Sequence, residues 1–291
     1  KAADIYDIDG DFNTQENVNY ISTTFNLISP NSILTSQEAR KFNDLNESVI
    51  APQKAEISKE QRTAQIAINL TNNYSSTISD VKIIGKIPFE GNTYCVSGKE
   101  TGSNFTTTLT EKGIILQDSL KDKAKVYYST NENPTTDLKN ESNGWITEVN
   151  DFSKIKTYLI DFGDSVLQKN ESHEFTYEVN VPEGLEYNQI SYSVHAVYFS
   201  LDTENGKYKT KTEPTKLGII ISKKYNFSLT KYQKNTNKKI SGAIYSLTEE
   251  GEKESKTIVT NENEEAVLKD LYVGKTYVLR EIKTPNEYVL N

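Results

Sequence analysis

A strict alternation of apolar and polar residues is the feature that most constrains the fold of this chain. Between Glu174 and Val181 the odd-numbered residues are apolar or aromatic, and the even-numbered residues are polar. From Ala64 to Leu70 the even positions are Ala, Ile, Ile and Leu, with polar or small residues between them. Because successive side chains of a β-strand point to opposite faces, this pattern predicts half-buried strands in antiparallel sheets.

Similar runs predict further strands near residues 81–87, 125–129, 155–162, 190–201 and 217–222, with turn residues between them. About seven strands over residues 46–222 are typical of an immunoglobulin-like β-sandwich. The fold class is therefore expected to be all-β, in the form of tandem β-sandwiches.

The N-terminal region is harder to place. Thr35 and Glu38 have the spacing of a capping box, so we expect one short helix at most, near residues 36–45. The rest of residues 1–45 is interpreted as a leader or linker, or as the tail of a preceding module. The chain opens with Lys1 and contains no Met, which suggests a processed chain or an excised fragment.

Composition excludes several classes of function. Lys plus Arg number 33 and Asp plus Glu 41, so the net charge is −8, which argues against a nucleic-acid partner. No apolar stretch reaches 18 residues, so no membrane span is expected. A single cysteine and two histidines exclude an internal disulfide and a cysteine zinc site. We therefore expect no enzyme of a familiar class, no cofactor and no metal.

Two smaller signals have structural interpretations that we favour. Acidic residues between Asp7 and Glu16 have part of the spacing of a calcium loop, but Ile5 stands where the first ligand belongs. A solvated acidic turn is the preferred interpretation. Trp145 follows a long polar stretch and could stack on a sugar ring, but the preferred interpretation is that it packs in the core.

The composition changes near residue 223. Residues 223–291 carry 12 basic and 10 acidic residues, whereas residues 1–222 are strongly acidic. We therefore place a domain boundary there, between a module at 46–222 and a smaller module at 223–291. A module of this size buries little core and often needs a cross-link to be stable.

Two charged residues of the smaller module stand where apolar residues belong. Lys231 shares the strand face of Phe227 and Leu229, and Glu281 shares that of Tyr277 and Leu279. Burying an ionisable side chain costs folding free energy unless the side chain is paired with an opposite charge or is in its neutral form. An amine so placed can attack a side-chain carboxamide to form an isopeptide bond, with the glutamate as the acid. The alternative is a buried ion pair with no bond.

Four segments of this module resemble the strands of collagen-adhesin B-repeat domains, which are also called CnaB-type or SpaA-type pilin domains: Phe227–Lys231, Ile240–Leu247, Thr260–Leu271 and Tyr277–Leu290. The last segment is similar to the family's E-box, with Glu287 in place of the usual glycine. The resemblance implies a prealbumin-like sandwich in which Lys231 forms the bond and Glu281 catalyses it. The acceptor Asn or Asp of the family lies on a final strand, which is expected beyond Asn291.

The upstream module resembles, less specifically, the Ig-like modules that precede such domains in Gram-positive surface proteins. The resemblances together imply a structural or adhesive segment of a secreted, cell-wall or cell-surface protein, such as an adhesin or pilin-like stalk. A host extracellular-matrix protein or a surface glycan is the expected partner. The alternative is a carbohydrate-binding accessory module of a secreted enzyme.

Overall fold

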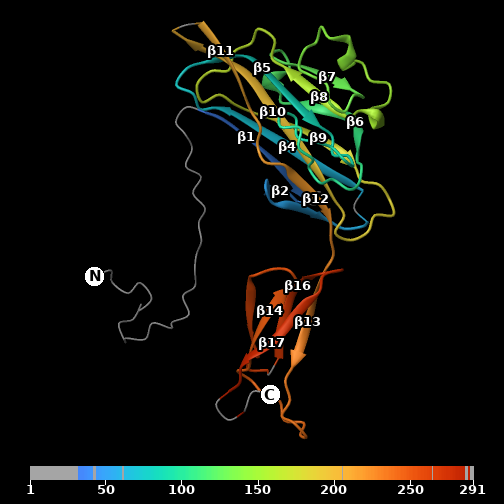
Figure 1. Ribbon diagram of the computed structural model, residues 1–291, viewed down its shortest axis with the longest axis vertical. Coiled ribbons are helices and arrows are strands. Elements are labelled where there is room, and N and C mark those ends of the chain that lie inside the picture. Colours follow the sequence, from blue (N-terminus) through green and yellow to red (C-terminus); the bar gives the residue numbers. More distant parts are fainter. Residues whose placement is uncertain are drawn as a thin grey trace, which may run out of the picture.

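The computed structural model describes residues 32–41, 44–60, 62–204, 206–263, 265–285 and 288. Within these ranges the chain forms β-strands and three short 3-10 helices, and no α-helix. The predicted all-β fold class is confirmed. Strands β1 to β12 form a larger module, and strands β13 to β17 form a smaller module that follows it along the long axis (Figure 1).

The larger module is a sandwich of two sheets (Figure 1). The first sheet has five antiparallel strands in the order β2 (Asp44–Ile50), β1 (Ile33–Lys41), β4 (Thr63–Asn72), β9 (Ser172–Asn180) and β6 (Thr108–Leu116). The second has the order β3 (Lys54–Ile57), β12 (Leu217–Ile221), β10 (Ile190–Thr203), β5 (Ile78–Lys86), β8 (Thr157–Asp161) and β7 (Lys125–Ser129). Strand β11 (Gly206–Thr212) pairs with β10 beyond this path, and β3 pairs with β12 in parallel.

The core of this module lies between the two sheets, where the sequence pattern predicts it. On β4 the even-numbered residues from Ala64 to Leu70 are buried, and on β9 Phe175, Tyr177 and Val179 are buried. They pack in one cluster with Ile83, Ile160, Val197 and Ile219 of the facing sheet. Three 3-10 helices lie in the connections: η1 (Asp118–Leu120), η2 (Glu141–Asn143) and η3 (Phe152–Lys154).

The short helix that the capping-box spacing suggests near residues 36–45 does not form, because residues 36–41 lie in β1 and residues 44 and 45 lie in β2. Strand β1 pairs with β4 over eight residues, from Ile33 to Arg40. Its buried residues Ile33, Gln37 and Ala39 have the period of a strand, and pairing with β4 overrides the local capping spacing. Strand β1 pairs with β4 in the first sheet, so this sheet includes residues before the boundary expected at residue 45. Residues 1–31, including the acidic stretch, lie outside the described residues.

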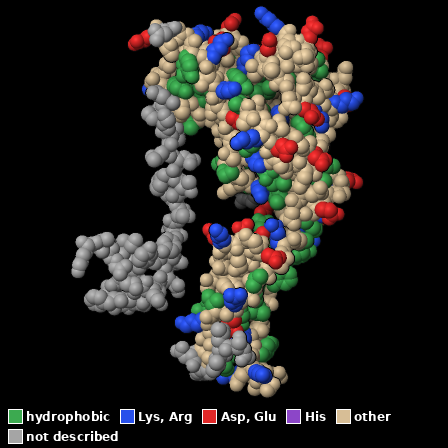
Figure 2. Space-filling view, in the orientation of Figure 1, with side chains coloured by type: hydrophobic (Ala, Val, Ile, Leu, Met, Phe, Trp, Pro, Cys, Tyr) green, Lys and Arg blue, Asp and Glu red, His purple; other side chains and the backbone are tan. Residues whose placement is uncertain are grey.

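The smaller module contains two short sheets. One pairs β13 (Lys224–Thr230) with β16 (Glu265–Tyr272), and the other has the order β15 (Ser255–Val259), β14 (Ile244–Glu249) and β17 (Tyr277–Lys283). Leu247, Leu268 and Leu271 form a small apolar cluster between them. Hydrophobic side chains appear on the surface of this module in Figure 2. Its exposed large apolar residues are Tyr225, Phe227, Tyr232, Val259, Val267, Val278, Leu279 and Ile282.

Glu56 joins the two modules. Ser222 and Lys223 separate β12 from β13. The carboxylate of Glu56 on β3 lies 2.8 Å from Lys224 Nζ and accepts a hydrogen bond from Tyr272 Oη. Asn188 Nδ2 donates to the carbonyl oxygen of Val273 at 3.1 Å. These polar contacts connect the start of β13 and the end of β16 to β3 and to the loop before β10.

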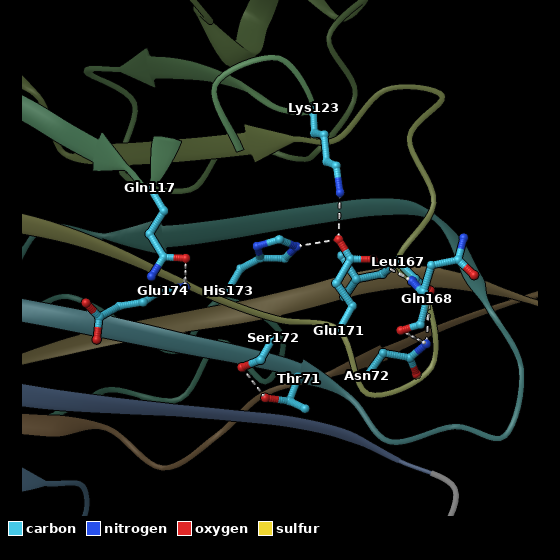
Figure 3. Close-up of polar contacts among 10 residues, drawn as sticks. All are labelled: Thr71, Asn72, Gln117, Lys123, Leu167, Gln168, Glu171, Ser172, His173 and Glu174. Carbon is cyan, nitrogen blue, oxygen red and sulfur yellow. Dashed lines mark hydrogen bonds and ion pairs between the residues drawn. The ribbon is translucent and has the colours of Figure 1, made fainter. Parts of the chain in front are cut away.

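Glu171 is the centre of a polar cluster at one end of the larger module (Figure 3). Its carboxylate lies 2.8 Å from Lys123 Nζ and 2.8 Å from His173 Nε2, and it accepts a hydrogen bond from the backbone N–H of Gln168 at 2.8 Å. Burial on its own would raise the pKa of Glu171, but these three hydrogen bonds lower it below the usual 4.5.

The stability that Glu171 contributes is therefore expected to depend on pH. A carboxyl group whose pKa is lower in the folded protein stabilises it above the unfolded pKa, and this contribution is lost as the pH falls through the folded pKa. The difference in urea midpoint between wild type and Glu171→Gln should be constant above about pH 6 and should shrink below the usual pKa of 4.5. A difference that is unchanged from about pH 6 to about pH 3 would exclude this role of the carboxylate.

Candidate functional site

The structure brings Lys231 and Glu281 together. Lys231 directly follows β13 and Glu281 lies on β17, so the pair connects the two sheets of the smaller module. Lys231 Nζ donates a hydrogen bond to Glu281 Oε1, and the two groups form an ion pair. The side chains are 18% and 20% exposed, so both are withdrawn from most of the solvent.

Neighbouring strands fix the position of each partner. The carbonyl oxygen of Lys231 accepts a hydrogen bond from the N–H of Ile240 at 2.9 Å, which holds its backbone. Glu281 stands opposite Tyr245 in the pairing of β17 with β14. Burial, and to a lesser degree the charge of Glu281, raise the pKa of Tyr245, which therefore stays protonated beside the carboxylate.

An open strand edge lies next to this pair. In the described part of the chain β16 is the one strand that pairs with β13. Phe227, which the sequence pattern assigns to the core face, is 56% exposed, and Tyr225 on the same strand is also exposed. The described residues place no Asn or Asp side chain in hydrogen-bond contact with Lys231. The amine and the acid are thus assembled beside an edge where a further strand would fit.

Trp145 does not form an exposed platform. Its indole Nε1 donates to the carbonyl oxygen of Thr135 at 2.9 Å, and its ring packs against a cluster of Ile84, Leu159 and Ala196. Cys95 packs against the same cluster, and burial raises the pKa of its thiol to about 12. Both side chains therefore pack within the protein, which agrees with the preferred interpretation of Trp145.

A cavity of about 1330 Å³ lies at the junction of the modules. Its walls combine small apolar residues such as Ala39 and Ala64 with charged residues of both signs, including Glu56 and Lys275. Several of these charges already have partners, as in the contact of Glu56 with Lys224.

Neither a membrane helix nor a metal centre occurs in the part of the chain that the structure describes. Its residues form no helix long and apolar enough to cross a membrane. They also contain no group of three or more His, Cys, Asp and Glu side chains placed to hold a metal ion.

Several solved structures are similar to more than half of the chain. They include the major pilin subunit BcpA of Bacillus cereus as its D312A variant (14% identity, 87% of this chain, 59% of that chain, TM-score 0.32). The 35 kDa C-terminal fragment of the major pilin GBS80 of Streptococcus agalactiae is similar at 10% identity (90% and 89% of the two chains, TM-score 0.31). The collagen-binding subdomain ACE19 of the Enterococcus faecalis surface protein ACE is similar at 8% identity (57% and 93%, TM-score 0.32).

The chain spans 59% of the length of that BcpA subunit. No curated protein matches it in sequence. One protein family does match, over the segment that contains both Lys231 and Glu281. Residues 225–291 of this chain match that family, the SpaA prealbumin-like fold domain, which agrees with the resemblance of the strand segments in the smaller module.

Proposed function

We propose that this chain is a structural or adhesive segment of a Gram-positive cell-surface protein, with an Ig-like sandwich at residues 33–222 and a SpaA-type module at 223–291. The observation that supports it most is the contact of Lys231 with Glu281 between two sheets, beside the open edge of β13. In this proposal the smaller module is stabilised by an isopeptide bond rather than by a large core. A matrix protein or surface glycan would be the partner of the segment.

The bond forms once between Lys231 and the side chain of an Asn or Asp on a strand added beside β13. Lys231 Nζ attacks the carboxamide carbon of an Asn, the new C–N bond forms and ammonia leaves; with an Asp, water leaves instead. Glu281 touches Nζ, so it can take the proton that the amine loses and return it to the leaving group. Without a nucleophile or without this proton transfer, no bond forms.

A chain that extends beyond Asn291 is expected to contain the cross-link. Mass spectrometry of its peptides should show Lys231 joined to an Asn or Asp, with one ammonia or one water less than the sequence requires. Lys231→Ala and Glu281→Ala should each abolish the link, the first by removing the nucleophile and the second by removing proton transfer. The linked module should be about 2–4 kcal/mol more stable than either variant, because a cross-link restricts the unfolded chain.

Lys234 supplies the matched control, because it is an exposed lysine close to Lys231 in the chain. Lys234→Ala should leave the link intact. If the extended protein yields the peptide of Lys231 unmodified, the isopeptide proposal is wrong and the residues form an ion pair alone.

The alternative, a carbohydrate-binding accessory module, requires an aromatic side chain that is free to stack on a sugar. Trp145, the one tryptophan of the chain, uses its indole N–H and its ring within the protein. The alternative is therefore the weaker candidate. Strong glycan-array binding that Trp145→Ala abolishes, in a variant that still folds, would favour it over the surface-protein proposal.

A further inference from the structure

Lysines gather on the outer face of the second sheet of the larger module. On β11 every second residue from Lys207 to Lys211 is a lysine, so three lysine side chains share one side of the strand. Their partners on β10 alternate with the buried Phe199, so the three lysines point away from the core. Strand β11 lies at the end of the larger module that is away from the smaller one (Figure 1).

A row of opposed residues continues this arrangement across five neighbouring strands. From β11 to β7 the row consists of Lys211, Tyr198, Lys82, Asp161 and Lys125. Because neighbouring strands are about 4.8 Å apart, the row extends over about 19 Å. We call the surface formed by its lysines and the other two of β11 the lysine face: Lys82, Lys125, Lys207, Lys209 and Lys211.

Two lysines of this face are paired with a carboxylate. Lys82 Nζ lies 3.2 Å from Asp161 Oδ2, and the side chain of Asp161 is only 12% exposed. Lys207 Nζ lies 3.3 Å from Asp80 Oδ2, and Asp202 stands opposite Lys207 in the hairpin. The other three form no ion pair with any residue that the structure describes: Lys125, Lys209 and Lys211. The face therefore carries an excess of positive charge, although the whole chain has a net charge of −8.

A tyrosine ring lies beside each end of the row. Lys211 Nζ is 5.7 Å from the centre of the Tyr198 ring, and Lys125 Nζ is 5.4 Å from the centre of the Tyr127 ring. Both rings pack against the apolar cluster that also contacts Trp145, so their positions are fixed. Such contacts hold the lysine side chains along the sheet and leave their positive charge in place.

The loop after β7 covers the neighbouring part of the same face. Trp145 from this loop packs on the cluster that contains Ala196. Lys82 Nζ donates to the carbonyl oxygen of Thr136 at 3.2 Å, which fixes the loop beside the row. The lysine face is thus bounded on one side and remains open on the side of Lys209. A long and narrow positive surface of this kind matches a single extended chain of repeated negative charges.

We propose that the lysine face binds an acidic polysaccharide, whose sulfate or carboxylate groups repeat along an extended chain. This names the partner class of the surface segment proposed above and rests on that proposal. Binding is by charge, without stacking on Trp145. Single-stranded nucleic acids stack their bases on free aromatic rings, whereas both tyrosine rings of this face are packed. Arginine, which binds phosphate through two parallel hydrogen bonds, is absent from the face.

The test is surface plasmon resonance of the chain on immobilised heparin, with dextran as the uncharged polysaccharide. We expect binding to heparin and none to dextran at about 50 mM NaCl, and an affinity at least about 10-fold weaker at about 300 mM NaCl, because salt screens exposed charges. Lys209→Ser combined with Lys211→Ser should weaken heparin binding by about 10-fold or more, since each lysine near an anionic surface contributes to affinity.

The matched control is Lys112→Ser combined with Lys154→Ser. It removes the same charge from two exposed lysines outside the lysine face, one in β6 and one in η3, and should change heparin affinity by less than about twofold. An equal loss in both double variants would show that net charge alone decides binding, and would overturn the proposal. Circular dichroism should show the same fold for both variants, because all four side chains are exposed.

Two further outcomes would overturn the assignment. If heparin does not bind at low salt, or binds the Lys209 and Lys211 variant as tightly as wild type, these lysines only protect the edge of the sheet from pairing. If a single-stranded oligonucleotide binds as tightly as heparin, the face is not selective for a polysaccharide. Neither outcome affects the surface-segment proposal, which the peptide mass of Lys231 tests separately.

Discussion

Replacing Asn72 with alanine is expected to lower the free energy of unfolding of the larger module by about 3–5 kcal/mol. Asn72 is fully buried, and Figure 3 shows its side chain beside Leu167 and Gln168. Its Nδ2 donates to three carbonyl oxygens and its Oδ1 accepts from one backbone N–H: those of Ser76, Leu167, Gln168 and Tyr74. The carbonyl oxygens of Leu167 and Gln168 also accept backbone N–H groups, those of Ile78 and Glu171. Alanine would therefore chiefly remove the partner of the Tyr74 N–H and of the Ser76 carbonyl oxygen, and buried polar groups without partners are costly.

Urea denaturation followed by circular dichroism measures this loss. Asn72→Asp provides a sharper variant, because it keeps the acceptor for the N–H of Tyr74 but turns a carboxylate oxygen toward three carbonyl oxygens. It should be at least as unstable as the alanine variant at neutral pH. Asn73→Ala is the neighbouring control and should cost less than about 1 kcal/mol. Equal effects at positions 72 and 73 would exclude the buried hydrogen bonds as the cause.

A second large effect is expected for Gly85→Ala. Gly85 stands opposite Tyr158 in the pairing of β5 with β8, and the tyrosine ring lies over it. A Cβ at position 85 would overlap Cζ and Oη of Tyr158 and would lie 2.7 Å from Cε1. Tyr158 is fully buried and packs against Tyr177 with ring centroids 5.6 Å apart, so it has no space to move. We expect a loss of about 3 kcal/mol, at the upper end of the usual cost of overpacking.

Gly218 is the matched control because it is also a glycine within a strand of the same sheet. A Cβ there would lie 3.0 Å from the tip of Ile190 and from the ring of Tyr192, and 3.1 Å from the flexible chain of Lys54. Small movements of these side chains relieve such contacts, so Gly218→Ala should cost less than about 1.5 kcal/mol. Gly85→Ala in a Tyr158→Leu background should also cost less than in wild type. The overpacking argument fails if the two alanine variants are equally stable.

The strands that the sequence predicts correctly are those with one apolar and one polar face. On β4 and β9 the inward side chains are Ile, Leu, Phe, Tyr and Val, so the period of two reports directly on burial. Strand β1 escapes this reasoning because two of its inward positions are polar. Thr35 Oγ1 lies 2.6 Å from His195 Nε2, and Gln37 Nε2 donates to the carbonyl oxygen of Ser193 at 3.2 Å. These partners lie on the facing sheet, far away along the chain, and no local pattern reveals them.

His195, on the facing sheet, is a second residue whose partner cannot be predicted from local sequence. It is completely buried, and burial lowers its pKa to about 3, so it is neutral at physiological pH. A neutral histidine whose Nε2 contacts a threonine hydroxyl can occupy an interior position without burying a charge. No pattern in the sequence reveals that the partner of His195 lies on β1, next to the segment where a helix was expected.

The contacts of Lys231 and of Lys86 differ in how well the sequence predicts them. Lys231 and Glu281 belong to segments with clear alternation, so the pattern of apolar residues alone predicts that both point inward, and they are in contact in the folded chain. The contact of Lys86 with Asn133 depends on the path of a loop of turns and a 3-10 helix, which has no periodic signal. The exposure of Phe227 was not predictable either, because alternation gives a face but not what covers it.

The short connection between the modules determines how tension would pass through the chain. Ser222 and Lys223 alone separate β12 from β13, so a pull on the smaller module acts directly along β12 (Figure 1). Strand β12 pairs with β3 on one side and with β10 on the other. Its inter-strand hydrogen bonds therefore run roughly perpendicular to the pulling direction. They are therefore loaded together, in shear, instead of being opened one at a time. Glu56 on β3 also holds Lys224, so the load is shared with a second strand before β12 can slide.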